Sequence, residues 1–196
     1  MRSAFLRNEI SKAIEMLNAV LLDGSAVAAA ERIASLGAEA IRGGNKVLFC
    51  GNGGSAADSQ HLAAELVGKL SLNRPGMAAM ALTVDTSALT AIGNDFGYEH
   101  IFSRQVEALG RPGDLLVGIS TSGRSGNVVA ALRTAQRMGI GTAAMTGSAR
   151  GAMVDFADVW LAIPHQETQK IQEGHIVMGH AFCGLIESEL YGPPAG

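Results

Sequence analysis

Apolar residues recur along the chain at two different spacings, and the spacing changes near residue 45. Before that point they fall three or four positions apart, as on one face of a helix. One such stripe consists of Ile10, Ile14, Leu17 and Leu21. Asp23-Gly24 ends it, and an alanine-rich segment follows from Ser25 to Arg42, where Gly43-Gly44 stops it. The first part of the chain is therefore predicted to form two helices.

Short, continuous apolar runs replace the helical spacing after residue 45 and are typical of buried strands. The runs span 46–50, 78–82, 115–119, 142–145 and 159–163. Helical stretches are predicted at 55–70, 87–93, 99–109, 125–138 and 168–190. This alternation indicates parallel strands joined by right-handed crossovers, with helices on both faces of the sheet.

Ligands of such sheets bind at the carboxyl ends of the strands, so the loops there are the first candidates for a site. The loop after the first strand reads Gly51-Asn52-Gly53-Gly54-Ser55 and leads directly into a helix. Its glycines allow close backbone approach to a ligand, and the free amides of the helix start attract anions. A dinucleotide site is a rival interpretation, because Gly51, Gly53 and Ala56 fit G-x-G-x-x-A and Asp85 follows the second strand. A tight turn without a ligand is a third.

The loop after the third strand is rich in hydroxyls and also opens a helix. It reads Ser120-Thr121-Ser122-Gly123-Arg124-Ser125. Hydroxyls together with free amides can hold a phosphate without a cation, and Ser125 can also cap the helix. An ordinary capped loop is the alternative. A sugar phosphate would use both loops, one for its phosphate and one for its hydroxyls.

Two predicted helices carry side chains that suit metal and proton chemistry. His61 and Glu65 are four positions apart on one helix, and Gln172 and His180 are eight apart on the last helix. Two imidazoles, a carboxylate and an amide can hold a divalent metal such as zinc, if the helices meet within one chain or across a subunit interface. From spacing alone, a His/Glu pair of this kind is more often an ordinary surface pair than a metal site, and His175 on the last helix is a decoy. Without further information, Asn94-Asp95 is a turn between helices.

Composition excludes some classes of function. The chain of 196 residues carries a net charge of -3, and aromatic residues make up 5%. With no run of Lys or Arg, a nucleic-acid partner is not expected. No apolar run reaches membrane-spanning length, and the N-terminus lacks the apolar region of a signal peptide. Cys50 and Cys183 could form a lone disulfide, but their apolar surroundings favour two buried thiols in a reducing compartment. We therefore expect a soluble, cytoplasmic protein with no membrane partner.

Several segments together resemble the phosphoheptose isomerases of the sugar isomerase (SIS) domain superfamily. They are Gly51–Ser55, the helix with His61 and Glu65, Leu89–Asp95, Gly118–Gly123, and Lys170–Glu173 with His180. The resemblance implies an α/β fold with a five-stranded parallel sheet, doubly wound in the flavodoxin-like manner. A single SIS domain would occupy residues 1–196, with helices in 1–42, the first of which packs in the oligomer, and the sheet core and last helix in 43–192.

The resemblance also implies a reaction and an assembly. Sedoheptulose 7-phosphate would become D-glycero-D-manno-heptose 7-phosphate through an enediol, the first step towards ADP- or GDP-heptose for lipopolysaccharide or other surface glycans. The protein would be a homotetramer with active sites between subunits and one zinc per subunit. Some SIS-domain proteins instead bind a sugar phosphate to regulate, or bind a partner in replication initiation; the candidate metal ligands argue against that alternative. A dinucleotide-dependent oxidoreductase is the third possibility.

The resemblance assigns roles by position. Substrate contacts are implied for Asn52, Gly53, Gly54, Ser55, Glu65, Asn94, Asp95 and Gln172, and phosphate contacts for Ser120, Thr121, Ser122 and Ser125. Zinc would be held by His61, Glu65, Gln172 and His180. Glu65 and His180 would be the catalytic acid/base pair. Arg124 departs from the family pattern, which commonly has a small polar residue there.

Overall fold

One parallel sheet organises the computed structural model, which describes residues 2–193. Its strands are β1 (Val47–Gly51), β2 (Ala79–Ala81), β3 (Leu115–Ile119), β4 (Gly141–Thr146) and β5 (Val159–Ala162). They are arranged in the order β2-β1-β3-β4-β5, and each neighbouring pair is parallel. This is the flavodoxin-like order. The winding reverses between β1 and β3, so the carboxyl ends of these two strands form the switch point where ligands bind in such sheets.

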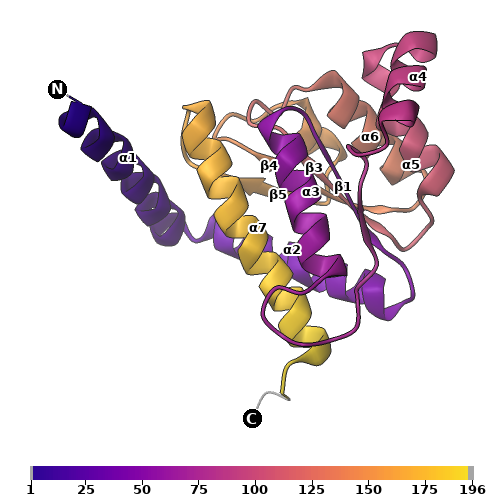
Figure 1. Ribbon diagram of the computed structural model, residues 1–196, viewed down its shortest axis with the longest axis horizontal. Coiled ribbons are helices and arrows are strands. Elements are labelled where there is room, and N and C mark those ends of the chain that lie inside the picture. Colours follow the sequence, from indigo (N-terminus) through magenta and orange to yellow (C-terminus); the bar gives the residue numbers. More distant parts are fainter. Residues whose placement is uncertain (1, 194–196) are drawn as a thin grey trace.

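Helices cover both faces of the sheet (Figure 1). The helices that share one apolar cluster are α1 (Arg2–Asp23), α2 (Ser25–Arg42), α3 (Gly54–Val67) and α7 (Thr168–Tyr191). The opposite face carries α4 (Thr86–Phe96), η1 (Tyr98–His100), α5 (Ser103–Leu109), α6 (Gly126–Arg137) and η2 (Ala152–Phe156). Along β1, Val47 and Phe49 enter the first cluster, whereas Leu48 and Cys50 enter the second. Burial of both faces explains why the strands are continuous apolar runs.

The predicted fold class is confirmed, and the thiols of Cys50 and Cys183 are buried and unpaired. The predicted turn at Asn94-Asp95 is wrong, because both residues lie in the last turn of α4 and the chain leaves the helix at Gly97, whose φ is 90°. The helix predicted to reach residue 70 ends at Val67. The backbone amide of Leu70 donates instead to the buried carboxylate of Glu187.

The first helix leans away from the body of the domain (Figure 1). Three members of its predicted stripe are exposed: Ile10 by 61%, Ile14 by 54% and Leu21 by 72%. Met16 and Val20 face the domain instead and are buried. The apolar stripe therefore exists, but within residues 2–193 most of it faces outward.

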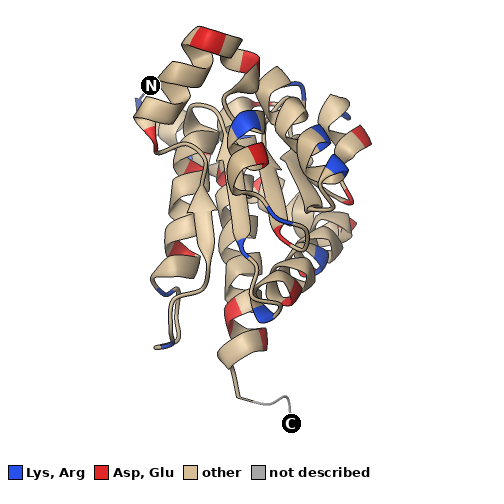
Figure 2. Ribbon diagram, turned by 90° about the vertical axis from the view of Figure 1, so that its right-hand side faces the viewer, with Lys and Arg blue, Asp and Glu red and all other residues tan. Residues whose placement is uncertain are grey.

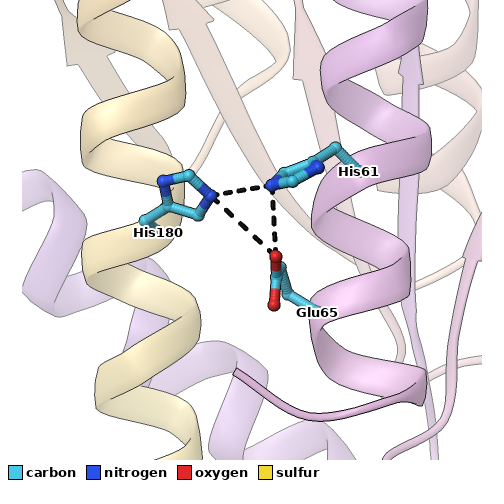
Figure 3. A group of neighbouring side chains, drawn as sticks. All are labelled: His61, Glu65 and His180. Atoms are coloured by element: carbon cyan, nitrogen blue, oxygen red, sulfur yellow. Dashed lines mark hydrogen bonds and ion pairs between the residues drawn. The ribbon is translucent and has the colours of Figure 1, made fainter. Parts of the chain in front are cut away.

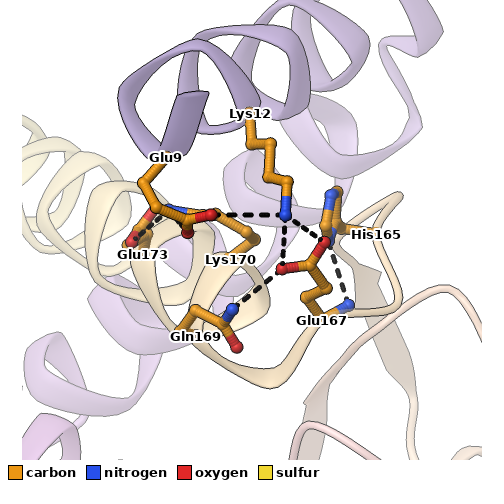
Figure 4. A network of polar contacts seen from close by, with 7 residues as sticks. All are labelled: Glu9, Lys12, His165, Glu167, Gln169, Lys170 and Glu173. Atoms are coloured by element: carbon orange, nitrogen blue, oxygen red, sulfur yellow. Dashed lines mark hydrogen bonds and ion pairs between the residues drawn. The ribbon is translucent and has the colours of Figure 1, made fainter. Parts of the chain in front are cut away.

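Ion pairs fasten α1 to the start of α7 (Figure 4). Nζ of Lys12 lies 2.9 Å from Oε1 of Glu167, and Nζ of Lys170 lies 3.4 Å from Oε2 of Glu9. Lys170 also binds Glu173 at 2.9 Å, so its almost fully buried ammonium group has two carboxylate partners. Because Glu167 immediately precedes α7, these contacts join α1 to the first turn of that helix.

Charged side chains of both signs are scattered over the elements and do not gather into one basic face (Figure 2). This agrees with the absence of a Lys/Arg run in the sequence. Among residues 2–193, no helix taken singly has the length and apolar character to cross a bilayer. α1 and α2 satisfy that test only together, as a pair bent by 75°.

Candidate active site

The loops that follow β1 and β3 meet in one cavity of about 300 Å³ at the switch point of the sheet. Its lining residues are Asn52, Gly53, Gly54, Ser55, Ile119, Ser120, Thr121, Ser122, Ser125, Thr168 and Gln172. All of these side chains are uncharged. An anion bound here would be held by amides, hydroxyls and helix ends, as the sequence predicts for a phosphate.

Three helices begin at this cavity. Gly54 and Ser55 open α3, Ser125 precedes α6, and Thr168 is the first residue of α7. Each helix start presents unpaired backbone amides and about half a positive charge. Thr168 was not a candidate in the sequence, because no local pattern shows that the last helix starts beside a loop some forty residues earlier.

The hydroxyls of the second loop lie close together. Oγ of Ser120 is 2.8 Å from Oγ of Ser125 and 3.4 Å from Oγ of Ser122. Ser125 occupies the N-cap position of α6, but its hydroxyl points to Ser120, so the predicted capping bond is not the one it makes. The backbone amide of Arg124 donates to Oγ of Ser122 at 3.2 Å. The hydroxyls are thus gathered at one side of the cavity.

Gln172 closes the cavity from α7. A Cβ atom added at Gly54 would lie 2.5 Å from Nε2 of Gln172, which is closer than real side chains approach. Glycine at position 54 therefore lets the first turn of α3 pack directly against this amide. The preceding Gly53 has a φ of 55°, a left-handed conformation that favours glycine and turns the chain into the helix.

A second group of polar side chains lies where α3 passes α7 (Figure 3). Nε2 of His61 is 2.7 Å from Nε2 of His180 and 3.1 Å from Oε1 of Glu65. Nε2 of His180 is 4.0 Å from the same carboxylate oxygen. The imidazole rings meet edge to face, with centroids 4.9 Å apart. The chain thus brings together two imidazoles and one carboxylate without help from a partner.

These three residues suit a divalent metal. One ligand atom from each lies within 4.8 Å of the other two, and nitrogen and carboxylate oxygen are donors that zinc accepts. Gln172, the fourth predicted ligand, lies eight residues before His180, about 12 Å along the helix axis. In this chain it lines the cavity at the loops. The structure therefore groups three of the four predicted ligands directly.

Asn52 stands at the centre of the site. It lines the cavity at the loops and a neighbouring cavity of about 400 Å³ that is bounded by α4 and η1. Its side chain contacts Tyr98 and Asn127, which sequence reasoning did not select. Asn94 and Asp95 lie on the exposed surface of α4, where Nδ2 of Asn94 donates to Oδ1 of Asp95. Their helix neighbours Thr90 and Gly93 line the larger cavity.

Two other sequence candidates have structural roles. The side chain of Asp85 caps α4 by accepting a hydrogen bond from the backbone amide of Ala88. This carboxylate therefore has a structural role, which does not support the ribose contact that a dinucleotide site would need. His175 is buried, and its Nε2 donates to the carbonyl of Thr146 at 3.0 Å. Burial lowers the pKa of His175 to about 4, as expected of a neutral core histidine.

Known proteins resemble this chain over nearly its whole length. A model of the SIS domain family matches residues 11–147. Over 190 residues the chain is 54% identical to a phosphoheptose isomerase of Akkermansia muciniphila, covering 97% of this chain and 99% of that protein. The phosphoheptose isomerase structure from Neisseria gonorrhoeae is similar, with a TM-score of 0.89, 43% identity, and coverage of 96% of this chain and 100% of that one. The phosphoheptose isomerase structure from Francisella tularensis has a TM-score of 0.84 and 33% identity, with coverage of 95% of this chain and 96% of that one.

Proposed function

The chain belongs to the phosphoheptose isomerase family of SIS-domain proteins, and from this premise we propose that it converts sedoheptulose 7-phosphate into D-glycero-D-manno-heptose 7-phosphate. The single observation that carries the proposal is the pairing of an uncharged, hydroxyl-rich anion cavity with an imidazole–carboxylate cluster on the same two helices, α3 and α7. The product would feed the synthesis of ADP- or GDP-heptose for lipopolysaccharide or other surface glycans.

Isomerisation between ketose and aldose moves a proton between two adjacent carbons through an enediol. It requires a base to remove the proton, an acid to return it, and stabilisation of the negative charge that develops on oxygen. In our proposal Glu65 is the base and His180 the acid. Their separation of 4.0 Å supports the assignment, because both groups can reach one face of a small substrate.

The substrate phosphate would lie in the cavity between the loops. Ser120, Thr121, Ser122 and Ser125 would donate to its oxygens, with further amides from the starts of α3 and α6. Gly53, Gly54 and Ser55 border the same cavity, as does Gln172. Asn52, Asn94 and Asp95 would hold the hydroxyls of the sugar chain. The proximity of Thr90 and Gly93 to the larger cavity supports the contribution from α4.

We assign a zinc ion to His61, Glu65 and His180, with Gln172 as the fourth ligand, one per subunit. For His61, Glu65 and His180, the donor atoms and their spacing fit that metal. Bound zinc would polarise the substrate carbonyl as a Lewis acid. A carboxylate that ligates a metal is a weaker base, so the two roles of Glu65 compete. A zinc ion that mainly holds the site together, and leaves the proton transfer to Glu65 and His180, would reconcile them.

The same proposal includes a homotetramer with active sites between subunits. The outward-facing stripe on α1 supports it, because an exposed apolar helix face needs a partner surface. His61 is also accessible, with 48% of its side chain exposed, which leaves room for a neighbouring subunit to complete the site. We infer a cytoplasmic location from the two buried, unpaired thiols.

An assay of the purified protein with sedoheptulose 7-phosphate tests the proposed function. Formation of the aldose, followed by coupled detection or by NMR, is the expected result. Tight binding of the sugar phosphate without turnover would contradict the proposal and favour a regulatory SIS-domain protein. Turnover that requires added nicotinamide cofactor would instead point to an oxidoreductase.

A further inference from the structure

The side-chain amide of Asn52 is held by three hydrogen bonds from two other elements. Its Nδ2 donates to Oδ1 of Asn127 at 2.9 Å, and Nδ2 of Asn127 donates back to Oδ1 of Asn52 at 2.9 Å. The phenol of Tyr98 donates to the same Oδ1 of Asn52, also at 2.9 Å. The loop after β1, the start of α6 and the η1 turn therefore meet at one amide.

The Asn52 side chain has one hydrogen-bond donor that none of these three bonds uses. The carbonyl oxygen of Asn52 has two lone pairs, and both accept hydrogen bonds. Its amino group has two hydrogens, of which one is given to Asn127. One N–H bond remains. Since Asn127 is only 3% exposed, it forms a rigid side of the arrangement.

Asn52, which carries this N–H, borders three cavities. They are the cavity between the loops, the cavity beside α4, and a third cavity bordered by Tyr98, Ser125 and Asn127. Resting on the proposed isomerase function, we propose that Tyr98 and Asn127 are positioning residues, which fix the Asn52 amide so that its remaining N–H donates to an oxygen of the sugar chain. Neither residue needs to touch the substrate for this role.

Tyr98 is the residue through which the proposal is best tested. Its side chain is exposed, and it borders two of the three cavities. Replacing it with phenylalanine removes only the hydroxyl group. A neutral hydrogen bond contributes about 0.5–1.5 kcal/mol, which corresponds to about a two- to tenfold change in affinity. We expect Tyr98→Phe to raise KM by that factor with little change in kcat, because the Asn52 N–H that Tyr98 orients would hold substrate and transition state alike.

The experiment compares kcat, KM and the unfolding temperature of wild type, Tyr98→Phe, Asn52→Ala and the double variant. Tyr191→Phe is the matched control, since Tyr191 is the other tyrosine of the chain and lies at the end of α7. A positioning role predicts that Tyr98→Phe adds nothing to the KM of Asn52→Ala. A merely structural role would shift the unfolding temperature and would add to the effect of Asn52→Ala.

Unchanged KM in Tyr98→Phe, or an effect that persists fully in the Asn52→Ala background, would overturn the inference while leaving the proposed function intact. If wild type does not turn over sedoheptulose 7-phosphate, the proposed function fails, and calorimetric titration of the same variants with that sugar phosphate decides the inference. Weaker binding by Tyr98→Phe, absent in the Asn52→Ala background, supports it. Equal binding by wild type and Tyr98→Phe, or none by wild type, overturns it.

Discussion

Nε2 of His61 and Nε2 of His180 lie 2.7 Å apart, although the residues are 119 positions apart in the chain. Two ring nitrogens this close either form a hydrogen bond, in which one donates and the other accepts, or both point their lone pairs at a common metal ion. The carboxylate of Glu65, 3.1 Å from the first nitrogen, makes the second arrangement a three-donor site. This geometry leads to the first prediction.

Replacing His61 with alanine should lower the zinc content of the purified protein, and activity should fall in consequence. One nitrogen donor is lost while Glu65 and His180 are left in place. Elemental analysis together with turnover measures both effects. His100→Ala is the control, because His100 is exposed and lies on η1, and it should retain the metal of the wild type. Full activity of wild type after chelation would show that the metal does not take part in the reaction.

Glu65→Gln should behave differently from His61→Ala. Glutamine keeps the size and hydrogen-bonding reach of the side chain but cannot accept a proton from carbon. Loss of one acid/base partner typically costs about a hundredfold to ten-thousandfold in rate, so turnover should nearly vanish while the sugar phosphate still binds. Steady-state kinetics and calorimetry on this variant provide the two measurements. Turnover close to the wild-type rate would show that another group is the base.

Local pattern was sufficient for most of the fold. A strand buried on both faces needs apolar residues throughout, so β1 and β3 are visible in the sequence, as are the glycine- and serine-rich loops that follow them. The turn predicted at Asn94-Asp95 is wrong, because the polar pair continues α4 along its exposed side. Asn and Asp are common in turns, which is why the sequence predicts a turn there. The helix nevertheless continues through both residues and ends just before Gly97.

The missed parts of the site depend on tertiary contacts. Tyr98 reaches Asn52 across 46 residues, and Thr168 lines the cavity between the loops because α7 begins beside the loop after β3. Neither relationship leaves a spacing or a motif in the sequence. Both depend on the packing of the helices around the carboxyl ends of β1 and β3, which the order of the strands brings together.

Ser120→Ala combined with Thr121→Ala should weaken binding of the sugar phosphate strongly. Two hydroxyls are lost from a cavity whose lining has no cation to compensate. Hydrogen bonds to a charged group contribute about 1.5–3 kcal/mol each, so affinity should fall at least about tenfold in calorimetry. Ser148→Ala, which alters an exposed serine after β4, is the control. Unchanged affinity in the double variant would mean that the phosphate binds elsewhere.

Introducing charged residues on the outward face of α1 should dissociate the proposed tetramer. Ile10→Glu with Ile14→Glu would bury carboxylates in any interface formed by the stripe, at a cost that association cannot offset. Light scattering should then give a smaller mass than for wild type. Asn8→Glu, at an exposed position of the same helix that lies off the stripe, controls for added charge. A wild type that is monomeric at micromolar concentration would refute the tetramer directly.

His175 should make the protein less stable in mild acid. Its folded-state pKa is about 4, against 6.5 for an ordinary histidine, because burial disfavours the charged ring. Below pH 6.5 the unfolded chain binds a proton that the folded chain does not, so this group's contribution to stability is complete above that pH. As the pH falls from about 6.5 to about 4, the free energy of unfolding should drop by about 3 kcal/mol on account of this residue alone.

His175→Gln separates that effect from the titration of carboxylates. Glutamine can still donate to the carbonyl of Thr146 but takes up no proton. Urea unfolding of both proteins at pH 7 and pH 4.5, at one protein concentration because an oligomer's stability depends on it, gives the comparison. Wild type should lose about 2–3 kcal/mol more than the variant between the two pH values. If both proteins lose equal stability, burial does not lower the pKa of His175 in the folded state, and the prediction is wrong.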